Sequence, residues 1–169
     1  MFKNQFSVLL GGLLFGSVIA SLSSPAQATS PATVRPKTDA QVTALAIQAA
    51  KDAHIHQGIR SIKGSVFLTS YRIIIEYDPA YFSGVWKGRE QAFADGDTYH
   101  LADSFVRLLV KDGHNPSMSH DALFVTVCAR MPAPPSITGG AMEYRFGCSR
   151  YSPLRDTVSW NSHMTDHGD

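Results

Sequence analysis

The stretch HNPSMSH, residues 114–120, combines side chains that can bind metals. His114 and His120 flank Met118 just before an apolar segment. Imidazole and thioether groups are ligands that copper accepts, and imidazole also suits zinc. His114, Met118 and His120 are therefore the candidate metal ligands. Their spacing matches no strong metal signature, and solvated loop histidines beside a locally packed methionine explain it equally. We expect no cofactor, with copper or zinc as the alternative.

The sequence contains two cysteines, Cys128 and Cys148, which lie 20 positions apart. An isolated pair in a chain that enters an oxidising compartment is typical of a disulfide. A redox-active pair favours the closer spacing C-x-x-C, which is absent here. We predict a structural bridge between Cys128 and Cys148, worth about 3 kcal/mol in the chain-entropy description.

Four aromatic residues gather in a segment without a clear helical or strand pattern. They are Tyr81, Phe82, Trp86 and Phe93. Exposed tryptophan and tyrosine are typical anchors of protein recognition. The same rings could instead cover a face of a sheet. The sequence leaves both interpretations open, and the four residues are the candidate partner-binding set.

Catalytic chemistry has weaker support in the sequence. An enzyme needs an activated nucleophile or a positioned acid and base. His100 with Asp103 and Arg107 is one candidate group, but no serine motif such as G-x-S-x-G occurs. Helix-surface and loop positions explain these residues without chemistry. We predict no catalytic residue and a protein that is not an enzyme.

The first 28 residues predict an export signal peptide. Lys3 supplies a positive start, residues 6–20 are apolar, and Ala26-Gln27-Ala28 gives the small-x-small cleavage pattern. The apolar stretch is shorter than the ~20 residues that a membrane span needs. We expect cleavage after Ala28 and a periplasmic or secreted protein without a transmembrane segment.

About 140 residues remain after this cleavage, which suits a single domain. Residues 29–37 predict a disordered lead, 38–160 one α+β domain, and 161–169 a flexible tail. Without Lys3 the basic and acidic residues are equal in number. Nucleic acid and anionic membranes both favour a basic excess, so the balance argues against them as main partners. A local basic patch stays possible.

The predicted helices follow capping and periodicity signals. Thr38 and Gln41 form a capping-box pattern before apolar residues at helical spacing, and Gly58 is placed to end that helix. Asp97 or Thr98 can cap a second helix that Gly113 ends. The small alanines of the first helix predict that it approaches a sheet closely.

Strands are predicted by β-branched and aromatic runs with turns between them. Residues 62–79 predict a hairpin, and residues 122–131 and 142–151 predict two further strands. The order α-β-β-α-β-β predicts an α+β fold with a small antiparallel sheet, helices packed on one face, and one disulfide. If the cysteines face each other directly, Val125 and Val127 point to the other face and need cover of their own. Either both faces of the sheet are partly buried, or a bulge near Gly147 shifts the register and makes the cysteine pair diagonal.

These observations favour an exported, non-enzymatic binding or accessory domain of the bacterial envelope. Its expected partner is another envelope protein or a small ligand. A periplasmic protein that binds copper or zinc is the alternative, and a small secreted hydrolase is the third hypothesis. A fold of this class does not by itself determine the function.

Overall fold

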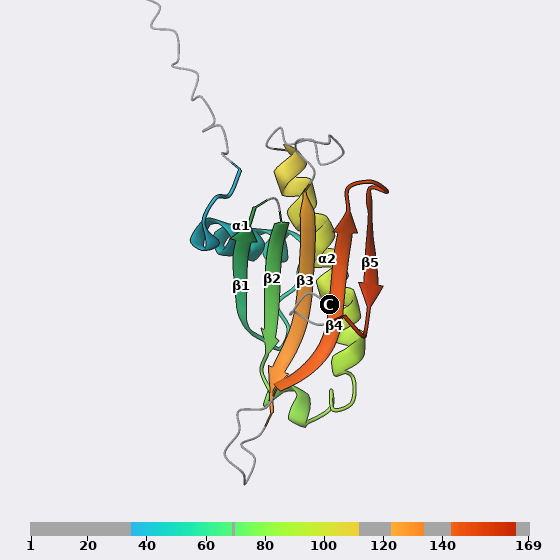
Figure 1. Cartoon of the computed structure of the whole chain (residues 1–169). Helices are drawn as coiled ribbons and strands as arrows, with labels where there is room; N and C mark the ends of the chain where they lie inside the picture. The colour runs from blue at the N-terminus through green and yellow to red at the C-terminus, as the bar shows by residue number, and fades with distance from the viewer. Residues whose placement is uncertain (1–34, 69, 112–122, 134–142, 165–169) are drawn as a thin grey trace, which may run out of the picture. The chain divides into compact units, whose positions relative to one another are not determined.

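The computed structural model describes residues 35–68, 70–111, 123–133 and 143–164, which form an α+β domain (Figure 1). Its elements in chain order are α1 (Asp39–Asp52), β1 (Ile59–Phe67), β2 (Ser70–Tyr77), the 3-10 turn η1 (Tyr81–Ser83), α2 (Glu90–Lys111), β3 (Phe124–Pro132), β4 (Glu143–Ser152) and β5 (Thr157–Asn161). The predicted α+β class is confirmed.

The sheet is mixed, and the prediction of an antiparallel sheet is wrong. Its five described strands lie in the order β1-β2-β3-β4-β5, and β2 pairs with β3 in parallel while the other neighbours are antiparallel. The physical reason is that α2 connects β2 to β3, and a helical crossover returns the chain to the end where the first strand began. The predicted order also lacked β5, because Thr157–Asn161 is a short and largely polar segment whose side chains are exposed or half-buried.

The core lies between the helices and one face of the sheet, with both helices drawn behind the sheet in Figure 1. The ring of Tyr71 on β2 packs edge-to-face on Phe105 of α2, with 5.6 Å between centroids. Alternate side chains of β2 and β3 are almost wholly buried on this face: Tyr71, Ile73, Ile75, Tyr77, Val125 and Val127. The residues between them, such as Arg72 and Glu76, point to the other face, which we call the open face.

Helix α1 begins at the predicted capping box. The Thr38 hydroxyl accepts a hydrogen bond from the Gln41 backbone N–H at 3.3 Å, and the Gln41 side chain accepts one from the Thr38 N–H at 3.2 Å. Two N–H groups that a helix start leaves without partners are thereby satisfied.

The end of α1 comes earlier than the sequence predicted. The helix ends at Asp52, where His54 adopts a left-handed backbone conformation with φ 57°. Such a residue ends a helix when it follows the last turn. Gly58 lies beyond this point, against the Tyr81 ring, where an added Cβ would come within 2.5 Å of a ring carbon.

Side chains of α1 satisfy the outer backbone groups of the edge strand β1. The Thr43 hydroxyl accepts a hydrogen bond from the Gly64 N–H at 2.8 Å and donates one to its carbonyl at 3.2 Å. The Asp39 carboxylate accepts a hydrogen bond from the Val66 N–H at 2.9 Å. These contacts occupy groups that an edge strand otherwise offers to a further strand.

Helix α2 begins at Glu90, and the predicted start at Asp97 or Thr98 is wrong. The sequence Asp-Gly-Asp resembles a turn, but tertiary contacts use both predicted cap residues inside the helix. Asp97 accepts a hydrogen bond from the Tyr77 hydroxyl, and the Thr98 hydroxyl lies 2.8 Å from the Ser149 hydroxyl in the core. Packing against the sheet therefore overrides the local turn signal.

A bulge in β4 settles the register of the disulfide. Cys128 lies directly opposite Cys148, and the register shifts next to Gly147, which has φ 121°. Of the two alternatives that the sequence left open, direct pairing of the cysteines is the one that occurs. A bulge next to Gly147 is present, but it does not make the pair diagonal. The bulge turns Phe146 to the helix face, where its ring lies 6.1 Å from that of Tyr77. The cysteines stay on the open face, and the helices cover the valines of β3.

Candidate anion-binding face

The predicted disulfide between Cys128 and Cys148 is present. Both side chains are buried, with 4% and 1% of their surface exposed, although they lie on the open face. The chain after β5 accounts for this burial, because Met164 packs beside both cysteines and its carbonyl lies 3.4 Å from the Cys148 sulfur. The bridge is therefore a structural tie between β3 and β4.

The four aromatic candidates pack against one another at one end of the domain. Trp86 stacks on Tyr81 with an interplanar angle of 9°, and its ring meets Phe93 edge-on at 5.3 Å. Phe82 is buried, with 2% of its surface exposed, whereas 39% of the Trp86 surface is exposed. The rings cover the core at the start of α2, and part of the Trp86 surface faces solvent. A partner-binding role for these residues stays a prediction.

The candidate metal ligands His114, Met118 and His120 lie outside the residues that the structure describes. Within the described ranges, no group of three or more His, Cys, Asp or Glu side chains is placed to hold a metal ion. Copper or zinc binding at residues 114–120 therefore stays a prediction.

One exposed surface of α2 carries the residues considered for catalysis. Asp103 and Arg107 form an ion pair one helical turn apart, with 2.8 Å between the Arg107 Nε and the carboxylate. His100 lines the same shallow surface as this pair, beside Asp52 at the end of α1. The guanidinium is already engaged by a carboxylate, which leaves an ordinary helix-surface pair.

A partly buried carboxyl group lies between α2 and the sheet. The Tyr77 hydroxyl donates a hydrogen bond to Asp97 at 2.8 Å. Burial raises the pKa of Asp97, although this hydrogen bond and the nearby charges of His100 and His56 act in the opposite direction. Burial and the Asp97 carboxylate both raise the pKa of Tyr77, so that its hydroxyl remains a donor. This pair joins β2 to α2.

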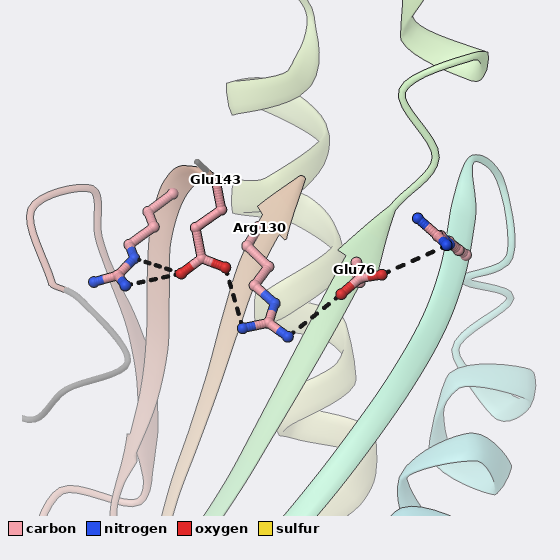
Figure 2. Close-up of polar contacts among 5 residues, drawn as sticks. Glu76, Arg130 and Glu143 are labelled. Carbon is pink, nitrogen blue, oxygen red and sulfur yellow. Dashed lines mark hydrogen bonds and ion pairs between the residues drawn. The ribbon is translucent and has the colours of Figure 1, made fainter. Parts of the chain in front are cut away.

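The open face carries a ladder of alternating charges across four strands (Figure 2). Arg130 on β3 lies between two carboxylates, 3.3 Å from Glu76 on β2 and 3.2 Å from Glu143 on β4. Arg60 lies 3.7 Å from Glu76, and Arg145 lies 2.8 Å from Glu143. We call these five residues the ion-pair ladder. Each of its carboxylates lies between two arginines, so the ladder is positive by one charge.

A second row of polar side chains crosses the open face closer to the β1–β2 turn. The strand registers place five residues side by side, one from each strand: Ser65, Arg72, Thr126, Arg150 and Ser159. We call these residues the arginine row. Arg72 and Arg150 are exposed, and they lie two strands apart, which corresponds to about 10 Å between backbones. Hydroxyl groups lie between and beside them.

The two guanidinium groups of this row are not engaged by acids. Within the described ranges, no carboxylate pairs with Arg72 or Arg150, and the Arg150 guanidinium lies 5.5 Å from the centre of the Phe124 ring. Guanidinium groups bind carboxylates, phosphates and sulfates in a two-pronged geometry, and hydroxyl donors add to such contacts. The row is chemically suited to an anion.

Positive charge dominates the open face as a whole. Among the described residues it carries two acidic side chains, Glu76 and Glu143, and six basic ones, Arg60, Lys63, Arg72, Arg130, Arg145 and Arg150. The sequence is nearly neutral because its acids are concentrated elsewhere. The nearly neutral net charge of the chain therefore does not exclude an anionic partner at the open face.

Comparisons of the chain with protein-family models, with curated proteins and with solved structures found no match. Neither of the two described helices combines the length and the apolar character that crossing a membrane requires. The function is therefore argued from the chemistry of the site.

Sequence reasoning missed the arginine row, although part of its signal was present. Strict alternation in YRIIIEY places Arg72 and Glu76 on one face of the strand and the buried Tyr71 and Tyr77 on the other face. The three adjacent isoleucines hide this alternation, because a continuous apolar run is also typical of a strand buried on both faces. The meeting of Arg72 with Arg150 depends on the parallel pairing of β2 with β3, and nothing in the local sequence specifies that pairing.

Proposed function

We propose that this chain is an exported, non-enzymatic binding domain of the bacterial envelope and that it holds an anionic partner on the open face of its sheet. The observation that carries the proposal is the arginine row, in which Arg72 and Arg150 are exposed on either side of Thr126 and pair with no acid among the described residues. The disulfide is compatible with an oxidising compartment.

Desolvation costs favour this row over the ion-pair ladder as the point of contact. Arg130 already forms ion pairs with two carboxylates, and an incoming anion has to compete with them. No carboxylate of the described part of the chain has to be displaced from Arg72 when a ligand binds it. The ladder fixes the strands and adds to the positive potential, and the row supplies the contacts.

The proposal is tested by retention on immobilised heparin, a sulfated polyanion, across a salt gradient. We expect the double variant Arg72→Gln/Arg150→Gln to elute at markedly lower salt than the unchanged protein, because each lost contact removes one released counterion. The matched control Lys51→Gln/Lys87→Gln removes two exposed charges elsewhere and should elute close to the unchanged protein. Equal effects of the two double variants, or no retention of the unchanged protein, would contradict the proposal.

A further inference from the structure

Exposed apolar side chains lie on two turns at one end of the sheet. Phe67 and Leu68 on the β1–β2 turn are 77% and 84% exposed, and Leu154 on the β4–β5 turn is 93% exposed. Both turns lie at the end where β3 begins, at the top of Figure 1. Large exposed apolar groups at one end of a domain indicate an interaction site.

The backbone of Leu68 adds an independent observation. Its φ is 53°, in the left-handed region that glycine and asparagine tolerate and that bulky residues rarely adopt. A leucine that is both strained and exposed contributes little to the stability of the isolated domain. Backbone strain of this kind is enriched at binding and active sites.

Basic side chains lie next to these exposed apolar side chains, one row further into the sheet. Arg72 is paired with Ser65, two residues before Phe67, which corresponds to about 7 Å along the strand. Arg150 occupies the same row, and Arg155 lies in the same turn as Leu154. The end of the sheet therefore presents apolar groups first and guanidinium groups one row further back.

Two of the described acids near this end of the sheet, Asp156 and Asp39, accept hydrogen bonds from groups other than the arginines. The Asp156 carboxylate accepts a hydrogen bond from the Tyr151 hydroxyl at 2.8 Å, on the helix side of the sheet. Asp39 is bound to the Val66 N–H. Among the described residues, neither acid pairs with Arg72, Arg150 or Arg155, so the positive charge of this end is available to a ligand.

We propose that the anionic partner is a lipid bilayer with anionic headgroups, which the domain meets end-on with its two turns. The inference rests on the proposed function. Apolar side chains of a peripheral protein enter the headgroup and acyl boundary to a depth of about 5–10 Å, which is the depth that separates the exposed apolar side chains from the arginine row. Basic residues near the surface add attraction to anionic lipids.

A lipid surface is favoured over a soluble polyanion because it uses both features of this end. A polysaccharide or nucleic acid can bind the guanidinium groups, but it leaves Leu68 and Leu154 in water. Insertion removes these side chains from water, which is favourable in proportion to the apolar area buried.

The inference is tested by co-sedimentation with vesicles of equal parts phosphatidylglycerol and phosphatidylcholine, and with vesicles of phosphatidylcholine alone. The variant Leu68→Asn/Leu154→Asn should lose about tenfold or more of its partitioning to the anionic vesicles, because the apolar insertion is gone. It should keep its retention on heparin. The control Val85→Asn, 91% exposed on the segment between η1 and α2, should bind as the unchanged protein does.

The two assays separate the possible failures. Retention on heparin without binding to anionic vesicles would overturn the lipid inference and leave the proposed function with a soluble polyanion or an acidic protein as partner. Unchanged vesicle binding by Leu68→Asn/Leu154→Asn would also overturn it. If the unchanged protein neither is retained on heparin nor binds anionic vesicles, both proposals would be overturned. Because asparagine tolerates the left-handed backbone of position 68, we expect the variant to remain folded.

Discussion

At the scale of single residues, Asp97 is a carboxyl group that the fold holds largely out of water. Its raised pKa means that the native protein binds the proton more tightly than the unfolded chain does. Stability that depends on this group is therefore fully present below its ordinary pKa of 3.8 and is lost as the pH rises through the raised native value. The Tyr77 hydrogen bond reduces this cost without removing it.

This sign leads to a prediction for Asp97→Asn. Asparagine can keep a hydrogen bond to Tyr77 but carries no charge, so the variant should gain stability relative to the unchanged protein as the pH rises above 3.8. The upper bound of this gain is about 1.4 kcal/mol for each unit by which the native pKa is raised, and solvent screening lowers it because Asp97 is only partly buried. Urea unfolding of both proteins below pH 3.8 and at neutrality measures it.

Asp95→Asn provides the matched control, because it removes an exposed carboxylate from the same helix. A stability difference between Asp97→Asn and the unchanged protein that stays constant across this pH range would show that Asp97 is not penalised by burial.

The local sequence does not predict the hydrogen bond between Tyr77 and Asp97. Asp97 and Tyr77 lie 20 positions apart, and Asp-Gly-Asp taken alone is ordinary turn chemistry. The cysteine pair could be predicted because a disulfide has a compositional signal. A hydrogen bond between a strand tyrosine and a helix aspartate has none.

At the scale of elements, the contact between α1 and β1 depends on Gly64. A Cβ at this position would lie 2.6 Å from a methyl carbon of Val42 and 2.8 Å from the backbone of Thr43. Backbone cannot move aside as a flexible side chain can. The two hydrogen bonds between the Thr43 hydroxyl and Gly64 require the same close approach.

We predict that Gly64→Ala lowers the free energy of unfolding by about 1–3 kcal/mol, as overpacking of a tight contact does. Gly96→Ala is the matched control. Gly96 lies within α2, where an added Cβ meets no atom within 4 Å, so alanine should stabilise the helix by about 0.5–1 kcal/mol. Denaturant unfolding of both variants tests the pair. A Gly64→Ala protein as stable as Gly96→Ala would contradict the close packing described for α1.

The sequence predicts the existence of most elements but not their partners. Thr38 and Gln41 identify the start of α1, and the hairpin at residues 62–79 is recognisable, because both signals are local. The parallel pairing of β2 with β3 joins Ser70 to Phe124 across a whole helix, so no local pattern encodes it. The arginine row follows from that pairing and was missed with it.

At the scale of the whole molecule, the fold separates charges that the sequence mixes. Alternation along β2 sends Ile73 and Ile75 to the helices, and Arg72 and Glu76 to the open face. Neighbouring strands then bring their basic residues into common rows. A nearly neutral chain thus acquires a positive face, which suits electrostatic attraction of an anionic surface at modest salt.

The disulfide affects the whole molecule because it restricts the unfolded chain. Cys128 and Cys148 are directly opposed, with 4.0 Å between their Cα atoms, so the bridge fits the native register of β3 and β4. Closing a loop of this length stabilises the native state by about 3 kcal/mol in the chain-entropy description. Burial of both sulfurs beside Met164 protects the bond from reductants in the folded protein.

We therefore predict that Cys128→Ala/Cys148→Ala unfolds at lower urea concentration, with a loss of about 3 kcal/mol. Unfolding of the unchanged protein in the presence of a reductant should give a similar value, because the denatured chain loses its crosslink. Thiol labelling of the denatured, unreduced protein should find no free cysteine, in agreement with the bridge. A double variant as stable as the oxidised protein would mean that the bridge forms without supporting the fold, and that the β3–β4 pairing is stabilised by its backbone ladder and packing alone.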